Sequence, residues 1–129
     1  MHQIAIGKVT VASAGTPTTM AAAITAAFGS GGIPKTLLDN GKVHKIEVFP
    51  LLANTHGVYV GLSTTSRQNP TFSASTGVGV LKELTTPAAT GHQDHYEACS
   101  HAGNDLNPND YLFDVVTSGE GVYVTLTVK

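Results

Sequence analysis

The stretch from Val43 to Ser63 limits what this chain can fold into more than any other part of its sequence. One face of its first arm carries His44, Ile46 and Val48, and one face of its second arm carries Val58, Val60 and Leu62. Alternation with a period of two residues is typical of β-strands that bury one face. Between the arms lies Asn54-Thr55-His56-Gly57, in which Gly57 can adopt the positive φ that a short hairpin turn needs. The stretch therefore predicts a β-hairpin, which needs partner strands because an isolated hairpin is not stable in water.

A second alternating stretch, Tyr111 to Val128, predicts another hairpin near the end of the chain, with its turn at Thr117 to Gly121. Shorter strand patterns occur in residues 2–12, around Val78 to Leu84, and within His92 to His101. In the first of these, Ile4 and Ile6 alternate clearly and Val9 and Val11 less so, with Gly7 as the candidate for a β-bulge. These segments supply the partner strands.

One segment has helical rather than strand character. Met20, Ile24 and Phe28 recur at four-residue spacing in an alanine-rich stretch, with Thr18 or Thr19 as the N-cap and Gly29 as the stop signal. About seven short strands separated by turn signals, with at most one short helix near the N-terminus, predict an all-β protein. The expected fold is an antiparallel β-sandwich, jelly-roll-like, in which residues 1–129 form a single domain.

The amino-acid composition limits the kinds of partner that we expect this chain to bind. Charged residues make up 12% of the chain, well below the roughly 25% of an ordinary soluble domain. Little like-charge repulsion opposes association, so we expect a homo-oligomer. The net charge of −2 offers no basic surface for nucleic acid, and no apolar run is long enough to span a membrane. Cys99 is the only cysteine, so an intrachain disulfide is excluded and synthesis in a reducing cytoplasm is expected.

The region from His92 to His101 contains the residue types that bind metals or act as nucleophiles. In an extended strand His95, Glu97, Cys99 and His101 project to the same side. Successive same-side residues lie nearly 7 Å apart, which is too far for them to share one zinc ion easily, and the order of His and Glu differs from the cupin metal motif. Cys99 with His95 or His101 also lacks a third orienting group and an oxyanion hole. We expect no catalytic site and no cofactor, with a cupin-like metalloenzyme as the weakest alternative.

Four segments in order resemble a family of small virion proteins of tailed bacteriophages, found among capsid decoration (cement) and head-fibre proteins. The segments are IAIGKVTVASAGTP, ANTHGVYVGLS, STGVGVLKEL and NPNDYLFDVVTSGEGVYVTLTV. The matching segments are spread over most of the chain but include only about half of its residues, and Thr18 to Asn40 and His92 to Asp105 depart from the family pattern. It implies a non-enzymatic structural protein on the outer capsid surface of the virion, made in the host cytoplasm.

The resemblance also implies the partners. Decoration proteins of this kind commonly form trimers that bind the major capsid protein and stabilise the head. The departure from the pattern at Thr18 to Asn40 then suggests where this chain meets its capsid, through Met20, Ile24, Phe28, Ile33, Leu37 and Leu38. Two alternatives stay open: the same segment covers one end of its own sandwich, or the protein is a head-fibre or adhesin module that binds host surface glycans.

Overall fold

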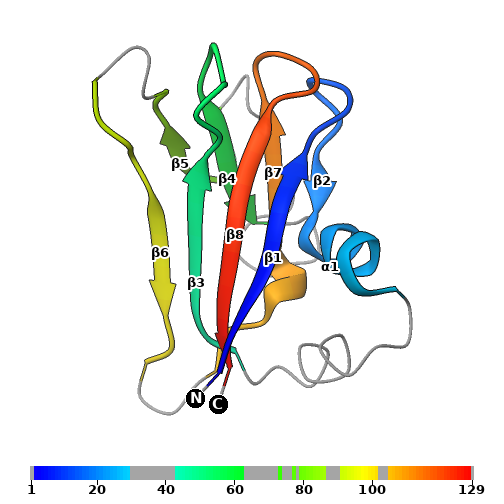
Figure 1. Cartoon of the computed structure of the whole chain (residues 1–129), viewed down its shortest axis with the longest axis vertical. Helices are drawn as coiled ribbons and strands as arrows, with labels where there is room; N and C mark the ends of the chain where they lie inside the picture. The colour runs from blue at the N-terminus through cyan, green and yellow to red at the C-terminus, as the bar shows by residue number, and fades with distance from the viewer. Residues whose placement is uncertain are drawn as a thin grey trace.

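The structure, a computed structural model, describes residues 2–29, 43–62, 73, 77, 79–86, 91–101 and 105–128. Within these residues the chain forms two four-stranded antiparallel sheets that pack face to face (Figure 1). Sheet A has the order β1-β8-β3-β6, and sheet B has the order β2-β7-β4-β5. The strands are β1 (His2–Thr10), β2 (Thr18–Thr19), β3 (Val43–Pro50), β4 (Val58–Leu62), β5 (Val80–Leu84), β6 (Tyr96–Cys99), β7 (Tyr111–Val115) and β8 (Gly121–Val128). The prediction of an all-β antiparallel sandwich is confirmed.

The strand pairing is nested from the ends of the chain inward. β1 pairs with β8, β2 with β7, β3 with β6, and β4 with β5, all antiparallel. Two further antiparallel ladders, β3 with β8 and β4 with β7, join these pairs into the two sheets. Strands from opposite ends of the sequence therefore lie side by side.

The two predicted hairpins are wrong, although their strands are present. β3 belongs to sheet A and β4 to sheet B, and β7 and β8 are divided between the sheets in the same way. Each connection therefore crosses from one sheet to the other. Gly57 does not adopt a positive φ. A Cβ at this position would lie 2.9 Å from Glu83 Oε1 and 3.2 Å from the Leu84 carbonyl oxygen, so the glycine allows β5 to approach.

Two β-bulges decide which residues of sheet A face the core. The predicted bulge at Gly7 is confirmed, with a φ of 83° and a register shift between Ala5 and Gly7. Ile6 and Val9 both reach the core because the bulge reverses the alternation. A second shift lies between Val43 and Lys45. It places Val43 in the core and His44 outside it, which corrects the face predicted for the start of β3.

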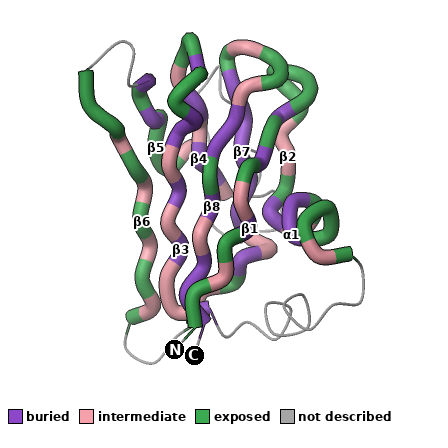
Figure 2. Tube along the Cα trace, in the orientation of Figure 1, coloured by how far each residue is buried: buried purple, intermediate pink, exposed green. Residues whose placement is uncertain are grey.

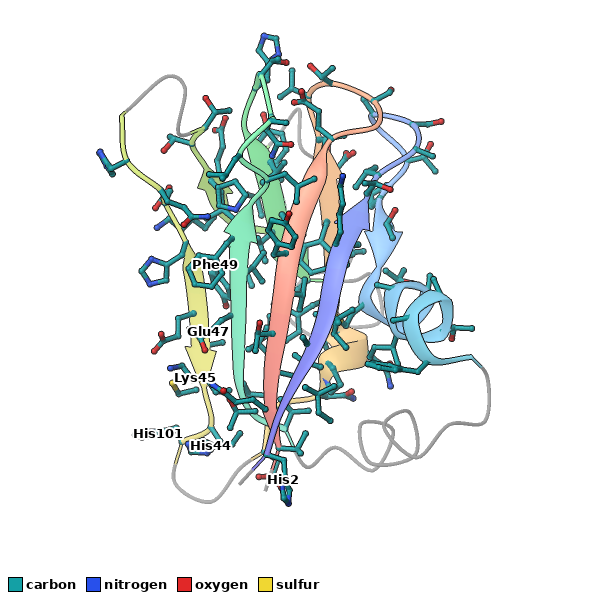
Figure 3. All side chains as sticks on the ribbon, in the orientation of Figure 1. His2, His44, Lys45, Glu47, Phe49 and His101 are labelled. Atoms are coloured by element: carbon teal, nitrogen blue, oxygen red, sulfur yellow. The ribbon has the colours of Figure 1, made fainter. Side chains whose placement is uncertain are left out.

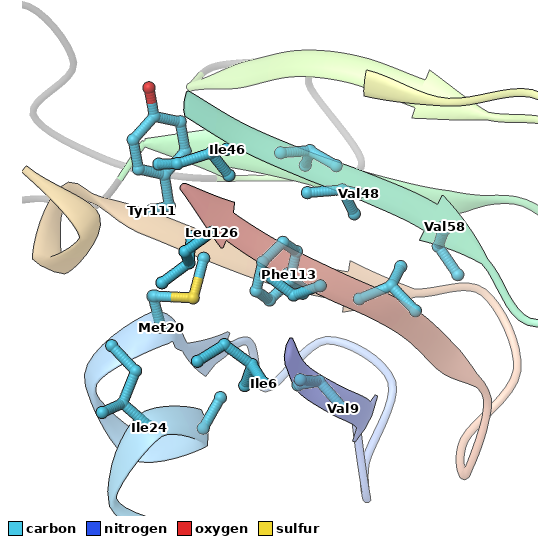
Figure 4. Close-up of a cluster of buried hydrophobic side chains, with 14 of the residues drawn as sticks. Ile6, Val9, Met20, Ile24, Ile46, Val48, Val58, Tyr111, Phe113 and Leu126 are labelled. Atoms are coloured by element: carbon cyan, nitrogen blue, oxygen red, sulfur yellow. The ribbon is translucent and has the colours of Figure 1, made fainter. Parts of the chain in front are cut away.

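The core lies between the two sheets and under the helix (Figures 2 and 4). Its largest fully buried side chains include Phe113 from β7, Met20 and Ile24 from the helix, and Ile46 and Leu126 from sheet A. Val60 and Val124, on the predicted buried faces, are 0% and 1% exposed. Burying a side chain of this size contributes about 1.5–3 kcal/mol.

The predicted helix is confirmed as α1 (Met20–Phe28). Thr19 is its N-cap and accepts a hydrogen bond from the Ala22 N–H at 3.1 Å. Gly29 ends it with a φ of 77° and donates its N–H to the Thr25 carbonyl at 2.8 Å. The short 3₁₀ helix η1 (Pro108–Asp110) precedes β7. No helix in the part of the chain that the structure describes is long and apolar enough to cross a membrane.

Hydrogen bonds between connections hold one end of the sandwich together. The Asn54 side chain is 2% exposed, donates to the Gly121 carbonyl at 2.8 Å and accepts from the Gly121 N–H at 3.2 Å. The Glu120 carboxylate accepts from the Thr55 N–H at 2.7 Å and from the His56 N–H at 3.2 Å. The connection after β3 is thus fixed to the start of β8, in the sheet that β3 itself belongs to.

Candidate functional site: the outer face of sheet A

The outer face of sheet A carries a row of rings from β8, from β3 and from the residue that directly precedes β6. Tyr123 of β8 lies directly opposite Phe49 of β3, and it has Lys8 of β1 opposite it on the other side. The Phe49 ring stacks with the ring of His95, with centroids 5.6 Å apart and planes 22° from parallel. Phe49 is half-buried, Tyr123 is 46% exposed, and His95 is exposed. We call Tyr123, Phe49 and His95 the aromatic row.

His95 is positioned by a contact between the edge strands of the two sheets. Lys82 of β5 donates from Nζ to Asp94 Oδ1 and to the His95 carbonyl, both at 3.0 Å. Asp94 Oδ1 also accepts from the His95 N–H at 2.9 Å, and Oδ2 accepts from the Thr85 N–H at 3.2 Å. Partial burial opposes ionisation of Asp94, but these hydrogen bonds outweigh it and lower the pKa of the carboxyl below its usual 3.8. The backbone that carries the His95 ring is therefore held on both sides.

A compensated charge cluster lies next to the aromatic row. Figure 3 shows Phe49, Glu47 and Lys45 one after another along the sheet. Glu47 faces Glu97 across the β3–β6 ladder, and Lys45 Nζ lies 3.6 Å from Glu47 Oε1 and 3.4 Å from Glu97 Oε2. Slight desolvation lowers the pKa of the Lys45 amino group, but the attraction of the Glu47 and Glu97 carboxylates outweighs it and raises this pKa above the usual 10.5. The lysine therefore offsets the repulsion between two acidic side chains that face each other.

The predicted metal-ligand set occupies the exposed side of an edge strand. Glu97 and Cys99 lie on the outer side of β6, and His95 and His101, also exposed, flank that strand. In the residues described by the structure, no group of three or more His, Cys, Asp or Glu side chains could hold a metal ion. The Cys99 Sγ lies 3.6 Å from Glu97 Oε1. Desolvation and this carboxylate raise the pKa of the Cys99 thiol above 9.0, which disfavours the nucleophilic thiolate.

The predicted capsid-contact residues divide into two groups. Met20 and Ile24 are 0% and 1% exposed and pack in the protein's own core, so they present no surface to another protein. Phe28 is half-buried against that core. Ile33, Leu37 and Leu38 lie outside the described residues. For α1, burial favours the alternative in which this segment covers its own sandwich, although no observation places the helix at an end of it.

The aromatic row was not predicted from the sequence. Phe49 and Tyr123 do occupy outward positions in their alternating strands, and that was the only available signal. Their adjacency depends on the β3–β8 ladder, and the contact with His95 depends on β6 joining the same sheet.

The chain was compared with protein-family models, curated proteins and solved structures, and none of them matches it.

Proposed function

We propose that this protein is a viral structural protein that decorates the outer surface of a phage head as a homo-oligomer. The observation that carries the proposal is the nested pairing of the strands, β1 with β8 through β4 with β5. This pairing is the one expected of a long antiparallel hairpin wound around one axis, so it supports the proposal of a jelly-roll arrangement, which recurs in viral capsid domains. The four family-like segments of the sequence support the same role.

The architecture suits a protein that acts by binding to a shell. Two sheets packed around one core, with the connection after β3 held to the start of β8 by the hydrogen bonds of Asn54 and Glu120, form a well-ordered body, and such order limits the entropy lost on binding. We propose a trimer, in which each copy contacts the major capsid protein. Once one copy is bound, the other two contacts become intramolecular, and avidity then exceeds single-site affinity by about 10²- to 10⁴-fold.

Binding to heads tests the proposal. Purified chain is mixed with heads of the source phage that lack it, the heads are sedimented, and the bound chain is quantified. We expect saturation at a fixed ratio to the major capsid protein and a higher melting temperature of the decorated heads. Heads that already carry the protein are the control and should bind no more. Binding that never saturates, or is equal for both kinds of head, would contradict the proposal.

A further inference from the structure

We propose that the aromatic row on the outer face of sheet A is a binding site for a neutral oligosaccharide. Tyr123, Phe49 and His95 would contact the apolar faces of successive sugar rings. The inference is independent of the capsid proposal, because a decoration protein and a head-fibre module could equally carry such a site.

The arrangement of the three rings is the first observation that supports an oligosaccharide site. Phe49 and His95 have nearly parallel planes, with centroids 5.6 Å apart. Superimposed rings in contact would have centroids about 3.5–4.0 Å apart, so at 5.6 Å the two rings do not cover each other's faces completely. Each ring therefore leaves part of its face uncovered by the other. Tyr123 continues the row from the neighbouring strand, one strand spacing of about 4.8 Å away. This spacing between neighbouring strands is comparable with the length of one hexose ring.

The charges on this face select the class of ligand. The strands of sheet A carry Lys8, Lys45, Glu47 and Glu97, two positive and two negative charges whose sum is zero. Lys45 is already engaged by both carboxylates. An anionic polymer needs an excess of positive charge, which this face does not offer. A neutral ligand rich in hydroxyl groups complements rings bordered by balanced charges and by the hydroxyl group of Thr125 on β8.

The backbone that carries the row is held in place before any ligand arrives. Phe49 and Tyr123 stand on central strands of sheet A, and the hydrogen bonds among Asp94, Lys82 and Thr85 hold the backbone at His95. Little conformational freedom remains to be lost when a ligand binds, which favours affinity from few contacts.

The test uses the full chain and an array of neutral hexose oligosaccharides, with heparin fragments as the anionic probe, followed by calorimetry on the best neutral ligand. We expect the wild-type chain to bind a neutral probe. Tyr123→Thr and Phe49→Thr should each raise Kd about tenfold or more, whereas Tyr123→Phe should bind like wild type. Leu52→Ser, at a loop residue that is 69% exposed and not part of the row, is the matched control.

Melting curves establish that each variant is folded, and Tyr123→Thr is the more robust of the two because its side chain is 46% exposed. The proposal is overturned if no neutral oligosaccharide binds, if only heparin binds, or if both threonine variants bind like wild type. It is also overturned if these variants leave glycan binding unchanged and lower the oligomer mass in light scattering, because the face would then join copies of the chain.

Discussion

Asn54 is the residue on which one connection between the sheets depends. Its amide group makes two hydrogen bonds to the backbone of Gly121, and its side chain is almost completely buried. An amide can satisfy a donor and an acceptor at once, which no apolar residue can do.

Replacing Asn54 with alanine should therefore lower the free energy of unfolding by about 2–3 kcal/mol, because polar backbone groups are left unpaired inside the protein. Urea unfolding followed by circular dichroism measures the change. Thr55→Ala is the matched control, since Thr55 is exposed and bonds to Glu120 in solvent. We expect it to change stability by less than about 1 kcal/mol. Equal effects of the two variants would contradict this role for Asn54.

Glu120 makes the stability of the same end of the molecule depend on pH. Desolvation opposes its ionisation, but hydrogen bonds from the Thr55 and His56 N–H groups and the Thr55 hydroxyl lower the pKa of its carboxyl below 4.5. A carboxyl whose pKa is lower in the folded state stabilises the fold above its ordinary pKa. That stability is lost as pH falls from about 4.5 through the folded pKa.

Glu120→Gln should consequently melt at a lower temperature than wild type at pH 7, and the difference should shrink as the pH falls below about 4.5. Melting curves of both proteins between pH 7 and pH 3 measure this difference. A difference in melting temperature that stays constant between pH 7 and pH 3 would show that the carboxylate charge does not act through these hydrogen bonds.

At the scale of elements, the pairing of β1 with β8 depends on a glycine. A Cβ on Gly121 would overlap the Val9 carbonyl oxygen and lie 2.8 Å from the Thr10 Cα. Gly121→Ala should therefore separate the ends of the two strands and prevent stable folding, as measured by circular dichroism and melting. Gly119→Ala is the control: its φ is +88°, and a Cβ at this position would have no neighbouring atom within 4 Å. It should fold with a loss of about 1–2 kcal/mol.

The role of α1 as a cover for the core can be tested by two neighbouring substitutions. Ile24 is 1% exposed, whereas Thr25 is exposed on the same helix. Ile24→Ala should lower the free energy of unfolding by about 2–4 kcal/mol because it leaves a cavity, while Thr25→Ala should change it by less than about 0.5 kcal/mol. Chemical unfolding measures both changes. Similar values for the two variants would mean that the helix does not pack as described.

Sequence alternation predicted the buried face of β4 and of most of β3 but could not predict which strands are neighbours. Val58 and Val60 of β4 face the core as expected, yet β4 pairs with β5 and β7 rather than with β3. Two strands that face each other across a sandwich show the same alternation as two strands joined in a hairpin. The difference lies in tertiary contacts such as the bonds between Asn54 and Gly121. For the same reason the aromatic row, which needs the sheet order, was not predictable.

At the scale of the whole molecule, the low charge content and the nested sandwich are the two observations behind the proposal of a homo-oligomer. A trimer would place three copies of each sheet face and three copies of each loop end around one axis. Contacts with a shell and contacts with a sugar can then use different faces of the same protein.

Electron cryo-microscopy of source-phage heads, with and without this protein, tests the central claim most directly. We predict density for two packed sheets per copy, grouped in threes on the outside of the shell, that is present in the first map and absent from the second. Two maps with identical outer surfaces, or density for this chain found only inside the head or on the tail, would contradict it.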